Sequence, residues 1–132
     1  MRTTLHVCLL AGAMAFCLAK AAASPVTGTW EGEDGGVKAV TLKIVDSGGK
    51  IRVDSVFYIV HDEGSGKHVG AASEAPSAEG TWNGRQLKFT VVNTAGARIA
   101  FEMTVTGDGK AELRRLPSDG MPELVVPLFR RK

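Results

Sequence analysis

Hydrophobic and polar residues alternate along much of this chain, and the alternation has a period of two residues. In the segment VTLKI at 40–44, every second residue is apolar, and the residues between them are Thr41 and Lys43. Because successive side chains of a β-strand point to opposite faces of the sheet, such segments predict strands with one buried face. Alternation or a short apolar run occurs in eight segments: 26–32, 40–44, 51–60, 80–82, 87–91, 99–105, 110–116 and 123–129. No segment after residue 24 has the longer period of a helix.

Glycine-rich turns separate these segments and predict that consecutive strands form antiparallel hairpins. The turn sequences are DSGG at 46–49, NG at 83–84, NTAG at 93–96 and TGDG at 106–109. Asn83-Gly84 is the pair preferred in a two-residue hairpin turn, which needs a positive φ at both positions. We therefore predict a single all-β domain over 24–132, an antiparallel up-and-down barrel or partly open sandwich of about eight strands.

The motif GTWEG at 28–32 recurs as GTWNG at 80–84, and the two copies hold the only two tryptophans of the chain. The strand and turn that follow the first copy, VTLKIVDSGG at 40–49, also align with LKFTVVNTAG at 87–96. A three-strand unit is therefore predicted to occur twice, once in each half of one sheet. We interpret the paired motif as a strand start in each half rather than as two matched ligand-binding sites.

The first 23 residues have the features of a cleaved signal peptide rather than of a membrane anchor. Arg2 precedes an apolar run from about Val7 to Ala19, and small residues follow at 21–23. This run is shorter than the ~20 residues that a membrane-spanning helix needs. We therefore expect cleavage after Ala23 and a mature protein that is periplasmic or secreted. Both cysteines lie within this leader, so the mature domain is expected to fold without disulfides.

Loss of the leader would also change the net charge. The whole chain has 16 basic and 14 acidic residues, and two of the basic residues would leave with the leader. The mature domain would then have no net charge, which gives no argument for binding nucleic acid or an anionic membrane. Basic residues gather near the C-terminus, either as charges that keep terminal strands from aggregating or as a patch for an acidic partner: Arg114, Arg115, Arg130, Arg131 and Lys132.

A Gly-x-Trp motif ending at Trp30, with a basic residue near the last strand at Arg130 or Arg131, resembles the pattern of calycins such as lipocalins and avidins. In that pattern the tryptophan packs across the closed end of a barrel, and a late arginine lies over it. The chain also resembles small exported bacterial lipocalin-like domains, whose motifs G-x-W-x-G and P-L-x-x-[KR] it contains at 28–32 and 127–131. The resemblance implies a lipocalin-like barrel and, since most such domains are functionally unassigned, no particular activity. The further tryptophans of a biotin pocket are absent from the sequence.

The interior of such a barrel either encloses a small apolar ligand or is filled completely by its own side chains, and the sequence leaves both alternatives open. The candidate ligand-binding residues are the apolar side chains expected to share this interior: Trp30, Phe57, Trp82, Phe89, Phe101 and Met103. Phe129 is expected to join the same interior.

One connection, HDEGSGKHVGAASEAPS at 61–77, is polar, rich in small residues and longer than an ordinary hairpin loop. It is the candidate partner-binding loop, with His61, Asp62, Glu63 and His68 as candidate contacts. Two imidazoles with nearby carboxylates would suit zinc, but a loop broken by glycines lacks the rigid elements that hold metal ligands. We therefore predict no metal site, no cofactor and no catalytic residue.

The leading hypothesis is a non-enzymatic exported binding module. It would hold a small apolar ligand in the barrel or bind a protein partner through 61–77. The alternative is an inhibitor or accessory protein of an exported protease or hydrolase. An enzyme built on 61–77 is a third hypothesis, for which the sequence offers no reaction to assay.

Overall fold

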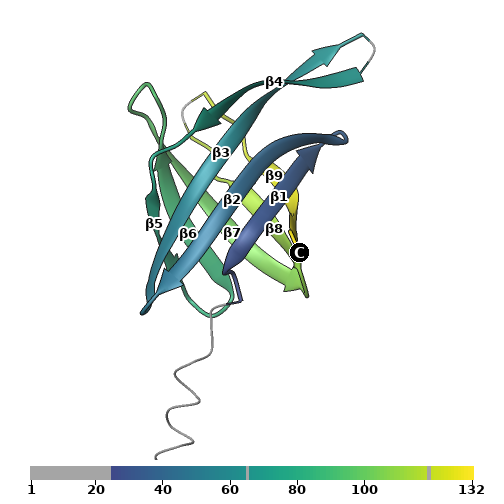
Figure 1. The fold of residues 1–132 in the computed structure, drawn as a ribbon. Helices are drawn as coiled ribbons and strands as arrows, with labels where there is room; N and C mark the ends of the chain where they lie inside the picture. Colours follow the sequence, from purple (N-terminus) through teal and green to yellow (C-terminus); the bar gives the residue numbers. More distant parts are fainter. Residues whose placement is uncertain (1–24, 65, 119) are drawn as a thin grey trace, which may run out of the picture.

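The computed structural model describes residues 25–64, 66–118 and 120–132, and the predicted leader over 1–23 lies outside the described residues. The described chain forms nine strands, and every pairing between them is antiparallel. They are β1 (Gly28–Asp34), β2 (Val37–Ser47), β3 (Lys50–Glu63), β4 (Gly66–Glu74), β5 (Ala78–Trp82), β6 (Gln86–Val92), β7 (Arg98–Gly107), β8 (Lys110–Arg115) and β9 (Leu124–Arg130) (Figure 1).

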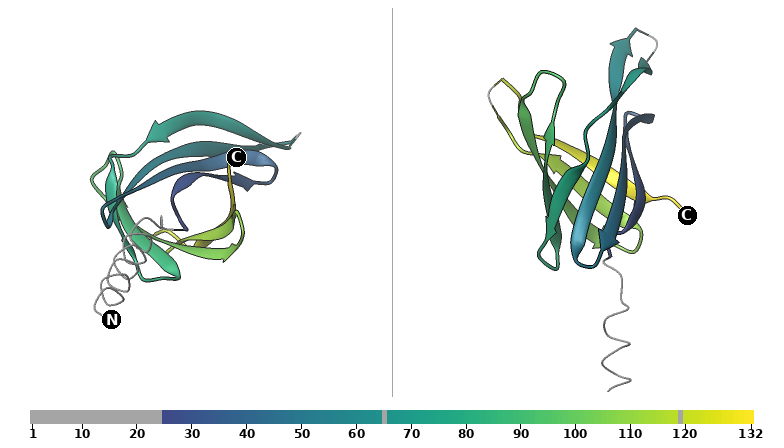
Figure 2. Two further views of the ribbon diagram at one scale, coloured as in Figure 1. Left: turned by 60° about the horizontal axis from the view of Figure 1, so that its bottom comes forward. Right: turned by 60° about the vertical axis from the view of Figure 1, so that its left-hand side comes forward.

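Eight of these strands close into a barrel. Their hydrogen-bonded order is β2-β1-β9-β8-β7-β6-β5-β3, and the additional pairing of β2 with β3 completes the ring. The ring surrounds a single interior, as the view from below in Figure 2 shows. The predicted all-β antiparallel fold is confirmed, and of the two predicted architectures the structure has the closed barrel.

The ninth strand, β4, lies outside the ring because β3 is long and has two neighbours along one edge. Residues Ile51–Val53 of β3 pair with β5, and residues from Val56 to the end of β3 pair with β4. Strands β4 and β5 thus follow one another along β3, and they are separated at Pro76, which has no N–H to give to a sheet. The upper part of β3 leaves the barrel wall together with β4, and the pair projects beyond the rim as a hairpin (Figure 1).

This β3–β4 hairpin corrects the prediction of an irregular loop at 61–77. Residues 61–63 continue β3, and residues 66–74 form β4. All the side chains of β4 are exposed except that of half-buried Lys67. A strand without a buried face carries no alternation of apolar residues, so the hydrophobic pattern could not reveal it.

The turn at Asn83-Gly84 also differs from its prediction. Gly84 has a positive φ of 94°, but no described residue other than glycine has one, so the predicted turn with a positive φ at both positions is wrong. Instead, the Asn83 side-chain oxygen accepts hydrogen bonds from the backbone N–H groups of Arg85 and Gln86, at 3.0 and 2.7 Å. The backbone N–H of Asn83 also donates to the Gln86 carbonyl oxygen at 3.1 Å, so the turn is centred on Gly84 and Arg85, one residue later than predicted, and the asparagine side chain stabilises it.

The lower half of the barrel is the end at which the described chain begins in Figure 1. This half is filled by side chains. The largest of those that are fully buried are Trp30, Leu42, Ile44, Val53, Leu87, Met103 and Leu128. The Trp30 indole N–H donates to the Val26 carbonyl oxygen at 2.8 Å, and the Arg130 guanidinium lies over the ring, 4.7 Å from its centroid. The expected arrangement of a first-strand tryptophan beneath a late arginine is therefore present, and Arg130 is the arginine.

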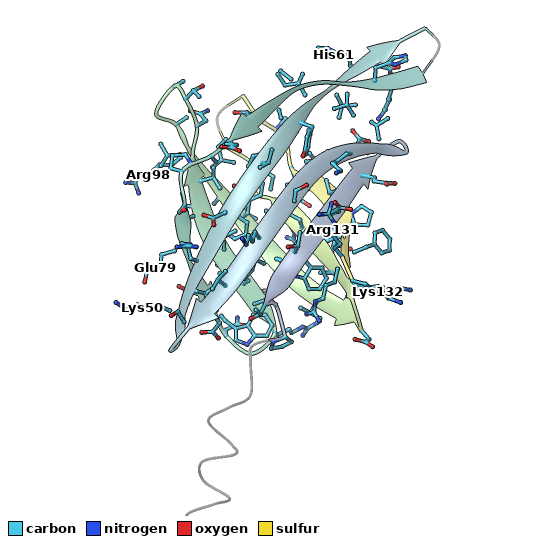
Figure 3. The ribbon with its side chains drawn as sticks, viewed as in Figure 1. Lys50, His61, Glu79, Arg98, Arg131 and Lys132 are labelled. Atoms are coloured by element: carbon cyan, nitrogen blue, oxygen red, sulfur yellow. The ribbon has the colours of Figure 1, made fainter. Side chains whose placement is uncertain are left out.

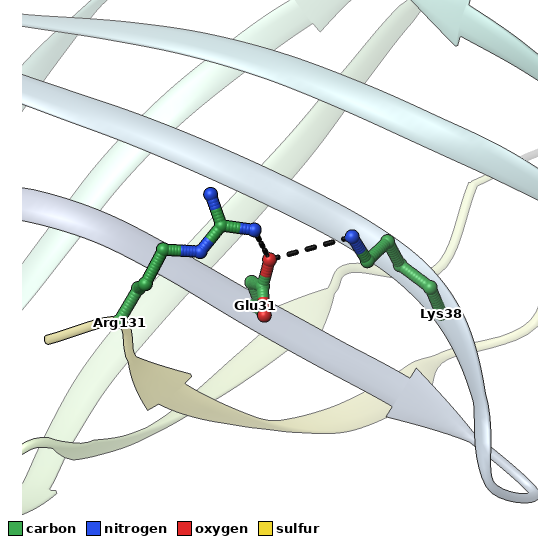
Figure 4. Close-up of polar contacts among 3 residues, drawn as sticks. All are labelled: Glu31, Lys38 and Arg131. Carbon is green, nitrogen blue, oxygen red and sulfur yellow. Dashed lines mark hydrogen bonds and ion pairs between the residues drawn. The ribbon is translucent and has the colours of Figure 1, made fainter.

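Arg131 points elsewhere and belongs to a surface network. Its guanidinium bonds to the Glu31 carboxylate, and the Lys38 ammonium lies 3.4 Å from the same oxygen (Figure 4). Arg115, by contrast, lines the upper part of the barrel interior. The basic residues near the C-terminus thus do not share one surface, and the alternative of a single basic patch does not hold.

Two glycines of the β1 and β5 strands face the interior where neighbouring side chains come close. A Cβ on Gly32 would lie 2.8 Å from side-chain carbons of Val40 and Leu128, and a Cβ on Gly80 would lie 2.7 Å from Leu87. Real Cβ atoms essentially never come this close to their neighbours, so a side chain at either position would force the packed neighbours to shift.

We predict that Gly32→Ala lowers the free energy of unfolding by about 1–3 kcal/mol, because the added methyl group overpacks the core. Gly107 is the matched control, since it also lies in a strand but a Cβ on it would meet no neighbouring atom within 4 Å. Gly107→Ala should change stability by no more than about 0.5 kcal/mol. Urea unfolding of both variants measures the difference, and equal losses would contradict this account.

We also predict that Arg130→Gln costs about 1–2 kcal/mol, because it removes a cation held against the buried face of Trp30. Arg131→Gln is the control and should cost no more than about 0.5 kcal/mol, because it breaks only an ion pair at the surface. The Arg130 variant should also shift the tryptophan emission spectrum, whereas the Arg131 variant should leave it unchanged.

Candidate functional site

The upper half of the barrel contains a cavity of about 690 Å³, at the opposite end from Trp30. Its size is within the range of about 300–1,000 Å³ that is typical of small-molecule sites. The wall is mainly apolar and is built from inward-facing residues of β2, β3 and β6–β9: Val40, Phe57, Val91, Ile99, Phe101, Leu113 and Val126. The interior is therefore not filled completely by side chains: its lower half is filled and its upper half is hollow.

Three phenylalanine rings form the floor between the two halves. Phe89 and Phe101 are direct cross-strand partners on β6 and β7, and their stacked rings have centroids 5.4 Å apart. Phe57 reaches across from β3 and stacks on the other side of Phe101, also at 5.4 Å. Stacked rings at this spacing attract each other beyond the effect of their buried area, so the floor is a rigid apolar platform.

The barrel wall opens on one side of this cavity. Strands β5 and β6 share only two residue pairs, Thr81 with Lys88 and Trp82 with Leu87. Above Lys88, no described strand pairs with the β5-facing edge of β6, because β4 has left the wall with β3. The cavity is bordered there by the corner between β4 and β5 at 75–76 and by the end of β6 at 91–92. The departure of β4 thus supplies the opening.

An ion pair connects the projecting hairpin to the cavity rim. The Lys67 ammonium of β4 donates a hydrogen bond of 2.8 Å to the Asp34 carboxylate of β1, which lines the cavity. The Lys67 side chain also lies over Gly35, where a Cβ would come within 2.5 Å of it. The hydrogen bond from Lys67 to Asp34, and then the charge of Asp34, raise the pKa of Lys67 above its ordinary value. The pair therefore favours the protonated lysine and holds the hairpin against the β1–β2 turn.

Arg115 is a basic residue whose position in its strand directs it inward. On β8 the alternate residues Ala111 and Leu113 are buried in the interior, and Arg115 is the next residue of the same parity. It lies directly opposite Phe101 in the register of β7 and β8. Its Nη2 donates to the Pro122 carbonyl oxygen at 3.1 Å, whereas its Nε is buried without a hydrogen-bond partner. Arg115 thus lines the cavity while its guanidinium is bonded to the loop at Pro122.

The structure brings only two of the six candidate ligand-binding residues to the cavity wall, Phe57 and Phe101. Phe89 does not line the cavity but stacks on Phe101 from the neighbouring strand. Trp30 and Met103 are fully buried in the filled lower half of the barrel.

The other two aromatic residues predicted to share the interior, Trp82 and Phe129, lie away from the cavity. Trp82 is partly buried and packs against the core at the end of β5, so the two copies of the repeated motif place their tryptophans in different environments. The prediction that Phe129 joins the interior is wrong, since 52% of it is exposed. The alternation of β9 gives the inward positions to Val126 and Leu128 and leaves Phe129 outside.

The candidate partner-contact residues lie at the tip of the hairpin, with His61 labelled in Figure 3. His61 and His68 are direct cross-strand partners, and Asp62 pairs in register with Lys67. Both histidines are exposed. In the described part of the chain, no group of three His, Cys, Asp or Glu side chains is arranged to hold a metal ion. Glu63 belongs to the end of β3.

Sequence reasoning missed the charged residues of the cavity. It places Arg115 with the C-terminal basic residues, although the spacing from Ala111 and Leu113 by four and two residues indicates an inward position. The Asp34–Lys67 pair has no such signal, because the two residues are 33 apart in the chain and meet only through the projecting hairpin.

Comparison of the sequence with known protein families gave no match, and comparison with curated proteins gave none either. Within the described residues, no helix has the length and apolar character needed to cross a membrane. The barrel and its cavity therefore carry the functional argument.

We predict that Asp34→Asn lowers the pKa of Lys67, because it removes the largest cause of its elevation. Asp62→Asn should lower this pKa less, because Asp62 acts on Lys67 only through its charge. A raised lysine pKa means that the stabilising contact is fully present at neutral pH and is lost only as the pH rises through that pKa. NMR titration of the lysine side chains measures the midpoints. At neutral pH, faster amide exchange in β4 of the Asp34→Asn variant should accompany the change, and unchanged exchange would contradict a role in holding the hairpin.

Proposed function

We propose that this protein is an exported, non-enzymatic binding module that holds a small apolar molecule in the upper half of its barrel. The observation that carries the proposal is the apolar cavity of about 690 Å³ above a stacked phenylalanine floor. Export rests on the leader predicted from the sequence, and the lipocalin-like character rests on the closed barrel with Trp30 beneath Arg130.

The division of the interior supports a binding role. The lower half buries most of the large apolar side chains, so folding does not require that the upper half be filled. A monomeric barrel that served only as a structural unit would gain stability by filling the cavity with larger side chains. The cavity instead keeps smaller residues such as Val40, Val91 and Val126 around its rings. A guest molecule would recover the burial that this wall lacks.

A protein partner at the β3–β4 hairpin is the second candidate function, and it includes the inhibitor hypothesis. The observation that favours it is the exposed edge of β4, which pairs with β3 on one side and with no other described strand. Such an edge is a template for a strand of another chain. A native mass spectrum of protein purified from its source separates the two: a bound small molecule favours the cavity, and a stoichiometric protein partner favours the hairpin.

We predict saturable binding of the neutral fluorophore N-phenyl-1-naphthylamine, with enhanced emission as the dye enters the cavity. Ile99→Trp should weaken this binding at least tenfold, because Ile99 lines the cavity and a larger ring there fills it. Thr90→Trp is the control, since exposed Thr90 lies on the neighbouring strand and faces outward. Fluorescence titration of the three proteins measures the difference. Absence of dye binding by the wild-type protein would contradict the proposed function.

A further inference from the structure

Arg115 gives the cavity a polar anchor, and its surroundings indicate which charge it would accept. Among the residues that the structure describes, Arg115 has no ion-pair partner. Its neighbour Arg114 faces outward, and the Arg114 Nε lies 4.0 Å from the Glu123 Oε1. Two adjacent arginines on one strand thus differ in direction, and no carboxylate of the described residues forms an ion pair with the inward one.

Two carboxylates line the cavity among the described residues, Asp34 and Glu74, and neither forms an ion pair with Arg115. Asp34 is already paired with Lys67 at 2.8 Å. Glu74 is exposed and lies opposite Val56, on the parity of β3 that alternates with the inward residues Ser55 and Phe57. Glu74 nevertheless borders the cavity, and none of the ion pairs among the described residues joins it to Arg115.

The hydrogen-bonding state of Arg115 points to an acceptor in the cavity. The buried Nε lacks a partner, and Nη2 bonds only to a main-chain carbonyl oxygen among the described residues. A carboxylate in the cavity could accept hydrogen bonds from the guanidinium N–H groups that face it. Arg115 is also the cross-strand partner of Phe101, and both residues line the cavity. An apolar body on the rings and an acid group at Arg115 would occupy adjacent parts of one site.

We infer that the cavity selects apolar carboxylic acids, with the carboxylate bound by Arg115 and the apolar body held over Phe57 and Phe101. This inference rests on the proposed function and names its ligand class. It distinguishes three probes of one shape: an acid should bind best, the corresponding alcohol less well, and the corresponding amine worst, because the amine places a second cation beside the guanidinium.

The test uses protein produced from the full chain and measures displacement of N-phenyl-1-naphthylamine by decanoate, decanol and decylamine at neutral pH. We expect decanoate to bind about tenfold more tightly than decanol, which corresponds to about 1.4 kcal/mol. Arg115→Gln should abolish this preference and leave the affinity for decanol within about twofold of wild type. Arg114→Gln is the matched control on the outer face, and it should retain the preference for the acid.

The outcomes separate this inference from the function on which it rests. If the wild-type protein binds decanol and decanoate equally, or prefers decylamine, the acid selectivity is overturned while ligand binding stands. If Arg115→Gln keeps the acid preference, Arg115 is not the anchor and the inference also fails. If neither the dye nor any of the three amphiphiles binds, the proposed function and this inference both fail.

Discussion

The contact between Trp30 and Arg130 closes one end of the barrel, and the rest of the architecture depends on that closure. The indole is fully buried, its N–H is satisfied by Val26, and its outer face is covered by the guanidinium. Because this end is sealed by a large ring, the residues above it can fill the lower half of the interior. The core is thus concentrated at one end, and a chain without disulfides in the folded domain can leave the other end hollow.

The length of β3 is the second constraint. A strand of 14 residues is longer than one wall of this small barrel requires, and its upper part carries β4 away from the ring. Pro76 marks the point at which the edge of β3 passes from β4 to β5. The departure of upper β3 and β4 from the barrel wall produces both the side opening of the cavity and the projecting hairpin. The two candidate binding features therefore have a common structural origin.

The predictable parts of the molecule are those in which one face of a strand is buried. Period-two alternation locates the eight barrel strands, and the Gly-x-Trp motif with a late arginine locates the closed end. Alternation does not report on a strand that is exposed on both faces, which is why it does not predict β4. The shared repeat around Trp30 and Trp82 does not reveal that one ring is buried and the other only partly so, because that difference depends on Arg130, far away in the chain.

Arg115 shows why the candidate site is harder to predict than the fold. Its parity on β8 can be read from the sequence, but the functional meaning of an inward arginine depends on what surrounds it. A buried donor without a partner costs about 1–3 kcal/mol, a substantial part of the about 5–15 kcal/mol that stabilises a typical domain. Methionine or leucine would follow Leu113 inward without that cost. The arginine is therefore poorly explained by stability, and it lies where the wall is hollow, beside the rings that an apolar guest would cover. The free-energy cost of the unpaired donor and the position of Arg115 at the cavity together favour a role in binding.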